Sequence, residues 1–135
     1  MNDIRRVKIL LIDDNPDDTF LTLRTLRTHK ITEDILVIHD GEEALEWLKN
    51  TATPPELVLL DLNLPKVSGI DILIYLKSNS RTQSIPVVVL TGSMDQRDLV
   101  ENYSRNANGY IEKPLDFARF VETVRDIGLT SLLVE

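Results

Sequence analysis

Residues 7–14 read VKILLIDD, a short apolar run that ends abruptly at two aspartates. An apolar run without polar alternation is typical of a strand buried on both faces of a parallel sheet. The next residues, Asn15 to Asp18, offer capping side chains and an early proline, which are signals of a helix start. The sequence therefore predicts a strand over residues 7–12 and then a helix to about His29, whose apolar residues recur at helical spacing: Phe20, Leu23 and Leu26.

The same strand-then-helix unit recurs along the chain. Further apolar runs predict strands at residues 35–38, 57–60, 86–90 and 109–111. Segments with helical periodicity follow at residues 42–49, from Gly69 onward, at 95–105 and from Phe117 onward. The apolar residues expected to pack from these helices are Ala44, Leu45, Leu48, Ile70, Leu73, Ile74, Leu76, Leu99, Val100, Tyr103, Phe117, Phe120, Val121 and Val124.

Five strands that alternate with five helices predict one α/β domain with a parallel sheet. Because crossovers between parallel strands are right-handed, few topologies remain, and the simplest has the strand order 2-1-3-4-5. We therefore predict a flavodoxin-like (βα)5 three-layer sandwich over residues 1–127. The apolar tail, residues 128–135, either folds back on this domain or covers a dimer interface, and we favour a homodimer.

The composition argues against several classes of protein. The 135 residues carry a formal net charge of −7 and no dense Lys/Arg run, which disfavours direct binding to nucleic acid. There is no cysteine for a disulfide or a zinc site, and His29 and His39 lack metal-ligand spacing. The apolar runs are far shorter than the roughly 20 residues of a membrane span. The first residues lack the apolar stretch of a signal peptide, so we expect a cytoplasmic protein.

Reactive side chains follow four of the five predicted strands. Asp13 and Asp14 follow the first, Asp61 the third, Thr91 the fourth, and Lys113 lies just after the fifth. Ligands of this fold bind beyond the carboxyl ends of the strands, so we expect these side chains to converge at one edge of the sheet. Each has an ordinary explanation by itself, as a turn, cap or loop residue. Their joint occurrence at the strand ends indicates a site.

The expected cluster of carboxylates predicts a bound cation. Three carboxylates packed together repel one another and raise each other's pKa unless a cation joins them. A hard cation that prefers oxygen ligands and retains several waters suits this cluster, which predicts Mg²⁺, with Mn²⁺ as a substitute. The expected ligands are Asp14, Asp61 and the backbone carbonyl of Asn63, with Asp13 acting through water.

This combination of groups predicts phosphoryl chemistry. A carboxylate beside Mg²⁺ can attack phosphorus and form an acyl phosphate. A metal, a lysine and a hydroxyl would stabilise the charged oxygens of the transferring phosphoryl group. Thr91 and Lys113 match the last two needs, and a cis bond between Lys113 and Pro114 would turn the lysine inward.

These residues resemble a known family, the receiver domains of bacterial response regulators. The matching stretches are ILLIDDN, LVLLDLNLPKVSG, IPVVVLTGS and GYIEKP, and the resemblance spans Val7 to about Ile127. It implies a phosphoacceptor of two-component signal transduction, in which Asp61 receives a phosphoryl group from a sensor histidine kinase. It also implies further roles: an acidic pair at Asp13 and Asp14, a switch hydroxyl at Thr91, a phosphate-contacting lysine at Lys113, a switch aromatic at Tyr110, room for phosphate at Gly92, and side chains that tune dephosphorylation at Asn63 and Ser93.

The NPDD and DLNLPK stretches resemble more narrowly the small regulators paired with cyanobacterial phytochromes. This resemblance implies a phytochrome as the partner kinase. The signal would leave through the face formed by segments 95–105 and 109–111 and the last helix, and with the tail this face is also the expected homodimer interface. Its polar residues fit a partner surface and an ordinary solvated face equally well: Asp95, Arg97, Asp98, Arg105, Asp116 and Arg119.

Three other functions are compatible with parts of the pattern. A phosphorelay intermediate would use the same site for onward transfer. A phosphatase resembling the haloacid dehalogenase group uses similar residues but needs a second Asp, two residues after the nucleophile, as a general acid. Asn63 stands there instead and cannot protonate a leaving group. A receiver that serves only as a binding module is disfavoured because no active-site residue is missing. We therefore expect no turnover of a separate substrate.

Overall fold

The apolar runs form strands and the periodic segments form helices in the part of the chain that the computed structural model describes: residues 7–29, 31, 34–62, 64, 67–92 and 107–129. The strands are β1 (Ile9–Ile12), β2 (Ile35–Ile38), β3 (Leu57–Asp61), β4 (Val87–Thr91) and β5 (Gly109–Glu112). The helices are α1 (Pro16–Thr28), α2 (Gly41–Asn50), α3 (Gly69–Ser78) and α5 (Phe117–Asp126). The predicted helix over residues 95–105 lies outside the described residues.

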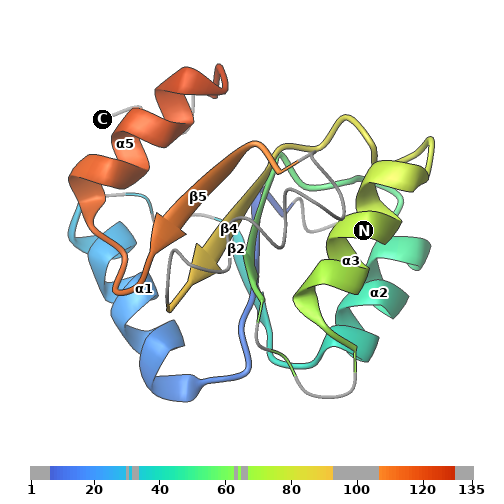
Figure 1. Cartoon of the computed structure of the whole chain (residues 1–135), viewed down its shortest axis with the longest axis horizontal. Coiled ribbons are helices and arrows are strands. Elements are labelled where there is room, and N and C mark those ends of the chain that lie inside the picture. The colour runs from blue at the N-terminus through green and yellow to red at the C-terminus, as the bar shows by residue number, and fades with distance from the viewer. Residues whose placement is uncertain are drawn as a thin grey trace, which may run out of the picture.

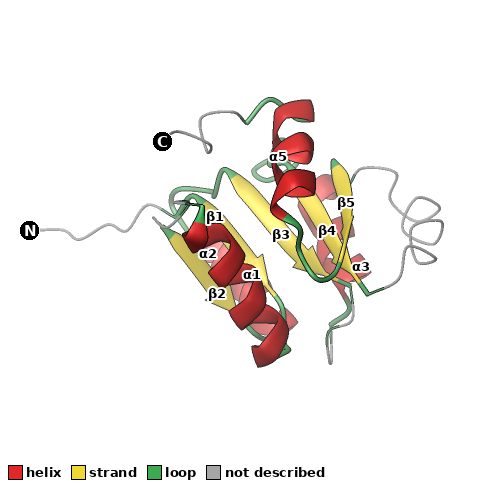
Figure 2. Cartoon of the chain, turned by 90° about the vertical axis from the view of Figure 1, so that its left-hand side faces the viewer, coloured by secondary structure: helices red, strands yellow, loops and turns green. Residues whose placement is uncertain are grey.

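The strands pair in parallel in the order β2-β1-β3-β4-β5. Their ends are in register, since Ile12 lies beside Leu60 and Thr91 beside Glu112. Helices α1 and α5 cover one face of the sheet, and α2 and α3 cover the other (Figure 1). Figure 2 looks onto the face that carries α1 and α5. The predicted strand order and the three-layer sandwich are therefore confirmed.

Alternate residues of each strand pack into two separate cores, as the pleat of a strand requires. The core below α2 and α3 includes Leu10, Ile12, Leu48, Val58, Leu60, Ile72 and Val89. The core below α1 and α5 includes Ile9, Leu11, Leu26, Leu59, Val88, Phe120 and Val124. Because both faces of the sheet are covered, β1, β3 and β4 are apolar up to their carboxyl ends, where the polar groups lie.

Each described helix begins at a side chain that accepts a hydrogen bond from the first turn. Asn15 accepts from the backbone N–H of Asp18 at 2.9 Å, and Asp116 accepts from that of Arg119 at 3.3 Å. Asp40 and Ser68 cap α2 and α3 in the same way. The helix starts predicted after Asn15 and at Phe117 are therefore confirmed, and the α1 cap fixes the chain directly after the acidic pair.

The buried face of two helices differs from the predicted one. Phe20 was predicted to pack, but 63% of it is exposed, and α1 buries Thr19, Thr22 and Leu26 instead. The buried residues are spaced by three and four, so Phe20 lies about 100° away from Thr19 around the helix. In α3, Ile72 is buried and Ile74 is exposed, for the same reason. The first strand also begins at Ile9, two residues later than predicted.

The first residues of the tail fold back on the domain. The backbone N–H of Leu129 donates to the carbonyl of Val124 at 2.9 Å, and Leu129 packs against the core below α1 and α5. Residues 130–135 lie outside the described part of the chain, as does their predicted role in a dimer. Among the described residues, no helix combines the length and the apolar character that a membrane span requires.

Candidate functional site

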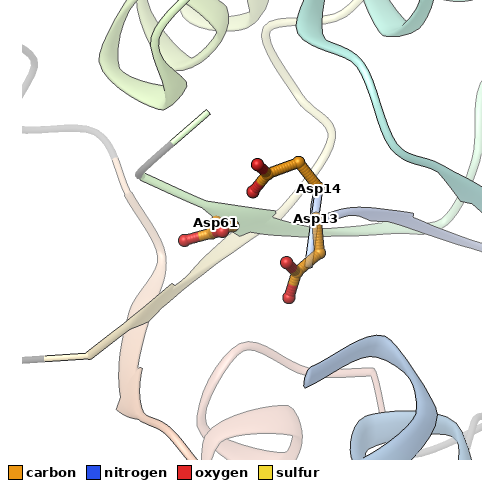
Figure 3. A group of neighbouring side chains, drawn as sticks. All are labelled: Asp13, Asp14 and Asp61. Carbon is orange, nitrogen blue, oxygen red and sulfur yellow. The ribbon is translucent and has the colours of Figure 1, made fainter. Parts of the chain in front are cut away.

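Three carboxylates meet at the carboxyl edge of the sheet. Asp13 and Asp14 follow β1, and Asp61 is the last residue of β3, the neighbouring strand. One oxygen from each carboxylate lies within 4.8 Å of the others. In Figure 3, Asp14 points to the side of α2 and α3, while Asp13 points to the side of α1 and α5. The predicted convergence of the acidic residues is therefore confirmed in space.

Burial makes this cluster electrostatically costly. Asp13 is completely buried and Asp61 is 2% exposed. The Oδ1 atom of Asp13 accepts from the backbone N–H of Asn15 at 3.0 Å, whereas its Oδ2 atom is buried and faces the ammonium group of Lys113 at 3.2 Å. A buried carboxylate oxygen beside two further carboxylates suits a cation or its bound water. The donor set, made of oxygen atoms alone, suits a hard divalent cation.

Lys113 supplies the positive charge that the cluster contains in this structure. Its Nζ atom lies 3.2 Å from Asp13 Oδ2, 3.3 Å from Asp61 Oδ2 and 2.9 Å from Asp18 Oδ2. The Lys113–Pro114 peptide bond is cis. Burial alone would lower the pKa of Lys113, but the hydrogen bond with Asp18 and the charges of Asp61 and Asp13 raise this pKa overall. The lysine is therefore held in its charged form at the edge of the sheet.

Thr91 is the last residue of β4, and Tyr110 lies in β5, the neighbouring strand. Thr91 is 1% exposed, and its backbone carbonyl accepts from the N–H of Lys113 at 2.8 Å. Tyr110 is half-buried and packs against the core below α2 and α3. Among the described residues, no atom lies within 4 Å of where a methyl group on Gly92 would be. Asn63 and Ser93 lie outside the described residues.

Two side chains at this edge were not predicted from the sequence. Asp18, the third residue of α1, makes the shortest of the three contacts to Lys113. His39 donates from Nδ1 to the backbone carbonyl of Asp13 at 2.9 Å and so connects the end of β2 with the end of β1. Asp18 could have been found from its place in the first turn of the helix that begins at the acidic pair. His39 gave no signal beyond its position after a strand.

A glycine fixes the position of Asp61. Gly69 begins α3, and its N–H donates to the carbonyl of Leu62 at 3.1 Å. A Cβ atom on Gly69 would clash with the backbone carbonyl of Asp61 and would lie 2.6 Å from the Cα atom of Leu62. The loop after β3 can therefore return to the sheet only because this residue has no side chain.

Six polar residues were predicted on the face that would pass the signal to a partner protein, and the structure describes two of them. Asp116 and Arg119 are both exposed, at the cap and in the first turn of α5. Asp95, Arg97, Asp98 and Arg105 lie outside the described residues. The α5 part of the predicted partner surface is therefore exposed to solvent.

Comparison with known proteins gives consistent matches over nearly the whole chain. Residues 9–125 match the model of the response regulator receiver domain. A probable methanogenesis regulatory protein, FilR2 of Methanothrix harundinacea, is 40% identical over 123 residues, which cover 88% of this chain and 79% of FilR2. The response regulator Rcp1 of Synechocystis is 34% identical over 124 residues, which cover 88% of this chain and 84% of Rcp1.

Solved structures agree with the sequence matches. The bacteriophytochrome response regulator AtBRR superposes with a TM-score of 0.85 at 38% identity, over 92% of this chain and 94% of AtBRR. A Mn²⁺-bound form of the response regulator Rcp1 superposes with a TM-score of 0.71 at 33% identity, over 96% of this chain and 95% of that one. The likeness therefore extends from the motifs to the arrangement of the whole domain.

Proposed function

We propose that this chain, which belongs to the response regulator receiver domain family, accepts its phosphoryl group on Asp61. As a receiver, the protein is a response regulator of two-component signal transduction. The observation that carries the assignment to Asp61 is its position. Asp61 is buried at the end of the central strand, its carboxylate lies within reach of Asp13 and Asp14, and Lys113 pairs with it.

The chemistry is a transfer from nitrogen to oxygen. The P–N bond of a kinase phosphohistidine breaks as a P–O bond forms to a carboxylate oxygen of Asp61, which yields an acyl phosphate. Lys113, held charged by its neighbours, is placed to neutralise a phosphoryl oxygen. The Thr91 hydroxyl, at the end of the adjacent strand, is the proposed partner of a second oxygen. Hydrolysis then releases inorganic phosphate and restores the carboxylate.

The carboxylate cluster is the proposed site of Mg²⁺, for which Mn²⁺ can substitute. Asp14, Asp61 and the backbone carbonyl of Asn63 would hold the ion, and Asp13, whose carboxylate lies beside those of Asp14 and Asp61, would act through water. The Mn²⁺-bound form of Rcp1, a relative with the same fold, supports a divalent ion. When bound, the ion neutralises charge on the carboxylates and on the transferring phosphoryl group.

Phosphorylation is proposed to act through Thr91 and Tyr110. A phosphoryl group brings about −1.5 to −2 charges, so the Thr91 hydroxyl is drawn toward it. The space that Thr91 leaves can admit the ring of Tyr110, which is half-buried on the next strand. The change would reach a partner through the face that includes β5 and α5. Asn63 and Ser93 are the proposed residues that tune the lifetime of the phosphate.

Receiver domains are phosphorylated by sensor histidine kinases, and we propose a phytochrome as the kinase here. The likeness to AtBRR and Rcp1 supports this partner. The output would be contact with a downstream protein or onward transfer in a phosphorelay, in the cytoplasm, without turnover of a separate substrate.

A homodimer through the α5 face and the tail is also proposed. A light-scattering mass equal to that of the monomer at tens of micromolar would contradict the dimer.

The assignment to Asp61 is tested with acetyl phosphate and MgCl₂, read by intact mass. We expect one added phosphoryl group in the wild type, none in Asp61→Asn, and none in either protein with EDTA. Asp71→Asn is the matched control, because Asp71 is an exposed carboxylate in the first turn of α3 and takes no part in the cluster. An adduct that persists in Asp61→Asn, or none in the wild type even with beryllofluoride as a phosphate mimic, would contradict the proposal.

A further inference from the structure

The closest ion pair of Lys113 is made with a residue outside the carboxylate cluster. Its Nζ atom lies 2.9 Å from Asp18 Oδ2, against 3.2 Å from Asp13 and 3.3 Å from Asp61. An ammonium group has three N–H donors, and here three carboxylates surround it. Asp18 thus engages a charge that the proposed function needs for the phosphoryl group.

The fold holds Asp18 in this place. Asn15 caps α1 and accepts from the backbone N–H of Asp18, which fixes the first turn of the helix beside the acidic pair. The amino terminus of a helix favours a negative side chain, which suits an aspartate at this position. The Asp18 side chain is 36% exposed, whereas those of Asp13 and Asp61 are nearly inaccessible. Asp18 therefore holds the lysine from the solvent side.

We propose that Asp18 competes with the phosphoryl group for Lys113 and thereby sets how tightly the site binds a phosphoryl group. The inference rests on the proposed function. Before phosphorylation, Asp18, Asp13 and Asp61 share the ammonium. A phosphoryl group on Asp61 adds about −1.5 to −2 charges and three acceptor oxygens. Lys113 then moves toward these oxygens, and its contact with Asp18 weakens or breaks.

The proposed competition predicts the direction in which loss of the Asp18 charge changes the affinity for a phosphate mimic. Asp18 stabilises the unphosphorylated site by pairing with Lys113, and its charge repels the incoming phosphoryl group. Removing the charge of Asp18 therefore strengthens the binding of a phosphate mimic. If Asp18 acted only as an anchor that keeps Lys113 in place, its removal would weaken that binding. If it acted only at the helix terminus, the stability of the fold would change and the binding would not.

Calorimetric titration of beryllofluoride, at saturating Mg²⁺, distinguishes these outcomes. We expect Asp18→Asn and Asp18→Ala to bind the mimic about two- to fivefold more tightly than the wild type, the range of a partly exposed ion pair. The gain should shrink at high salt. Asp18→Glu keeps the charge and should stay close to the wild type. Asp17→Asn is the matched control, because Asp17 lies in the same turn of α1 and is exposed.

The outcomes also separate this inference from the proposed function. Unchanged or weaker binding in both Asp18→Asn and Asp18→Ala, beside a wild type that binds the mimic, would overturn the competition and leave Asp61 as the phosphoacceptor. An equal gain in Asp17→Asn would overturn it as well, since the effect would then be general to negative charge at the start of α1. A wild type that binds no beryllofluoride with Mg²⁺ would overturn the proposed function, and this inference with it.

Discussion

Gly69 and Asp61 are in direct backbone contact, so that no side chain fits between the start of α3 and the end of β3. The contact joins the loop after the central strand to the proposed phosphoacceptor. The position of the Asp61 carboxylate therefore depends on a residue eight positions further along the chain that carries no functional group.

Gly69→Ala should lower both stability and phosphorylation. Its methyl group would clash with backbone atoms, which cannot rotate away as a flexible side chain can, so a loss of about 1–3 kcal/mol in the free energy of unfolding is expected. The displacement of Asp61 should slow labelling by acetyl phosphate. Urea denaturation and intact mass measure the two effects. Gly92→Ala is the control for stability, since a methyl group there meets no atom of the described part of the chain within 4 Å. Equal stability of the two variants would contradict the prediction.

His39→Ala should weaken metal binding as well as the fold. The Nδ1 donor of His39 holds the backbone carbonyl of Asp13, and without it the turn that carries Asp13 and Asp14 loses a restraint. The loss of one such hydrogen bond costs about 1 kcal/mol, so the Mg²⁺ dissociation constant should rise about fivefold, as measured by calorimetry.

The other histidine provides the comparison for this test. His29 also donates from Nδ1 to a backbone carbonyl, that of Thr25 at 2.9 Å, but it lies at the far end of α1 and stacks on Phe117. His29→Ala should lower the free energy of unfolding and leave the Mg²⁺ dissociation constant unchanged. A similar change of metal affinity in both variants would show that His39 does not act through the acidic turn.

Two lysines should give the metal-free protein opposite responses to alkaline pH. Burial lowers the pKa of Lys77, whose Nζ atom donates to the carbonyl of Ile85 at 2.7 Å. The unfolded chain then binds more protons than the folded one as the pH approaches 10.5, so this lysine makes the fold more stable as the pH rises toward that value. The raised pKa of Lys113 acts in the other direction, because its contribution is complete below 10.5 and is lost as the pH rises through the raised value.

Urea denaturation between pH 8 and pH 11 in EDTA measures both effects. Relative to Lys77→Met, the wild type should gain stability as the pH rises to about 10.5, the ordinary pKa of lysine. Relative to Lys113→Met, the wild type should lose stability above that pH. If the free energy of unfolding changed with pH in the same way in the wild type and in both variants, neither lysine would differ in proton affinity between the folded and unfolded states.

Arg81→Ala should destabilise the fold without altering phosphorylation. The Arg81 guanidinium donates to the carbonyls of Leu48, Lys49 and Thr51, which end α2. Carbonyls at the end of a helix lack partners within the helix and favour a cation, so a loss of about 1–2 kcal/mol in the free energy of unfolding is expected. Arg119→Ala, an exposed arginine of α5, should cost much less. Slower labelling by acetyl phosphate in Arg81→Ala would contradict a purely structural role.

Much of the fold could be predicted because the strands are short, largely apolar runs, each with a polar residue at or directly after its carboxyl end. Five such runs separated by periodic segments leave one simple parallel order, and β1 to β5 adopt it. The faces of the helices were less predictable. In α1, Thr19 and Thr22 face the sheet while Phe20 does not, and a search for apolar residues at helical spacing misses buried threonines.

The chain itself determined which groups stand at the strand ends, so the convergence of Asp13, Asp14, Asp61 and Lys113 followed from the order of the strands alone. Tertiary structure decided how these groups are held. The pairing of Asp18 with Lys113 joins residues 95 positions apart, and that of His39 with the Asp13 carbonyl joins residues 26 apart. Such contacts depend on the angle at which a helix or loop returns to the sheet. That angle is set by packing over the whole domain, and no local pattern of residues contains it.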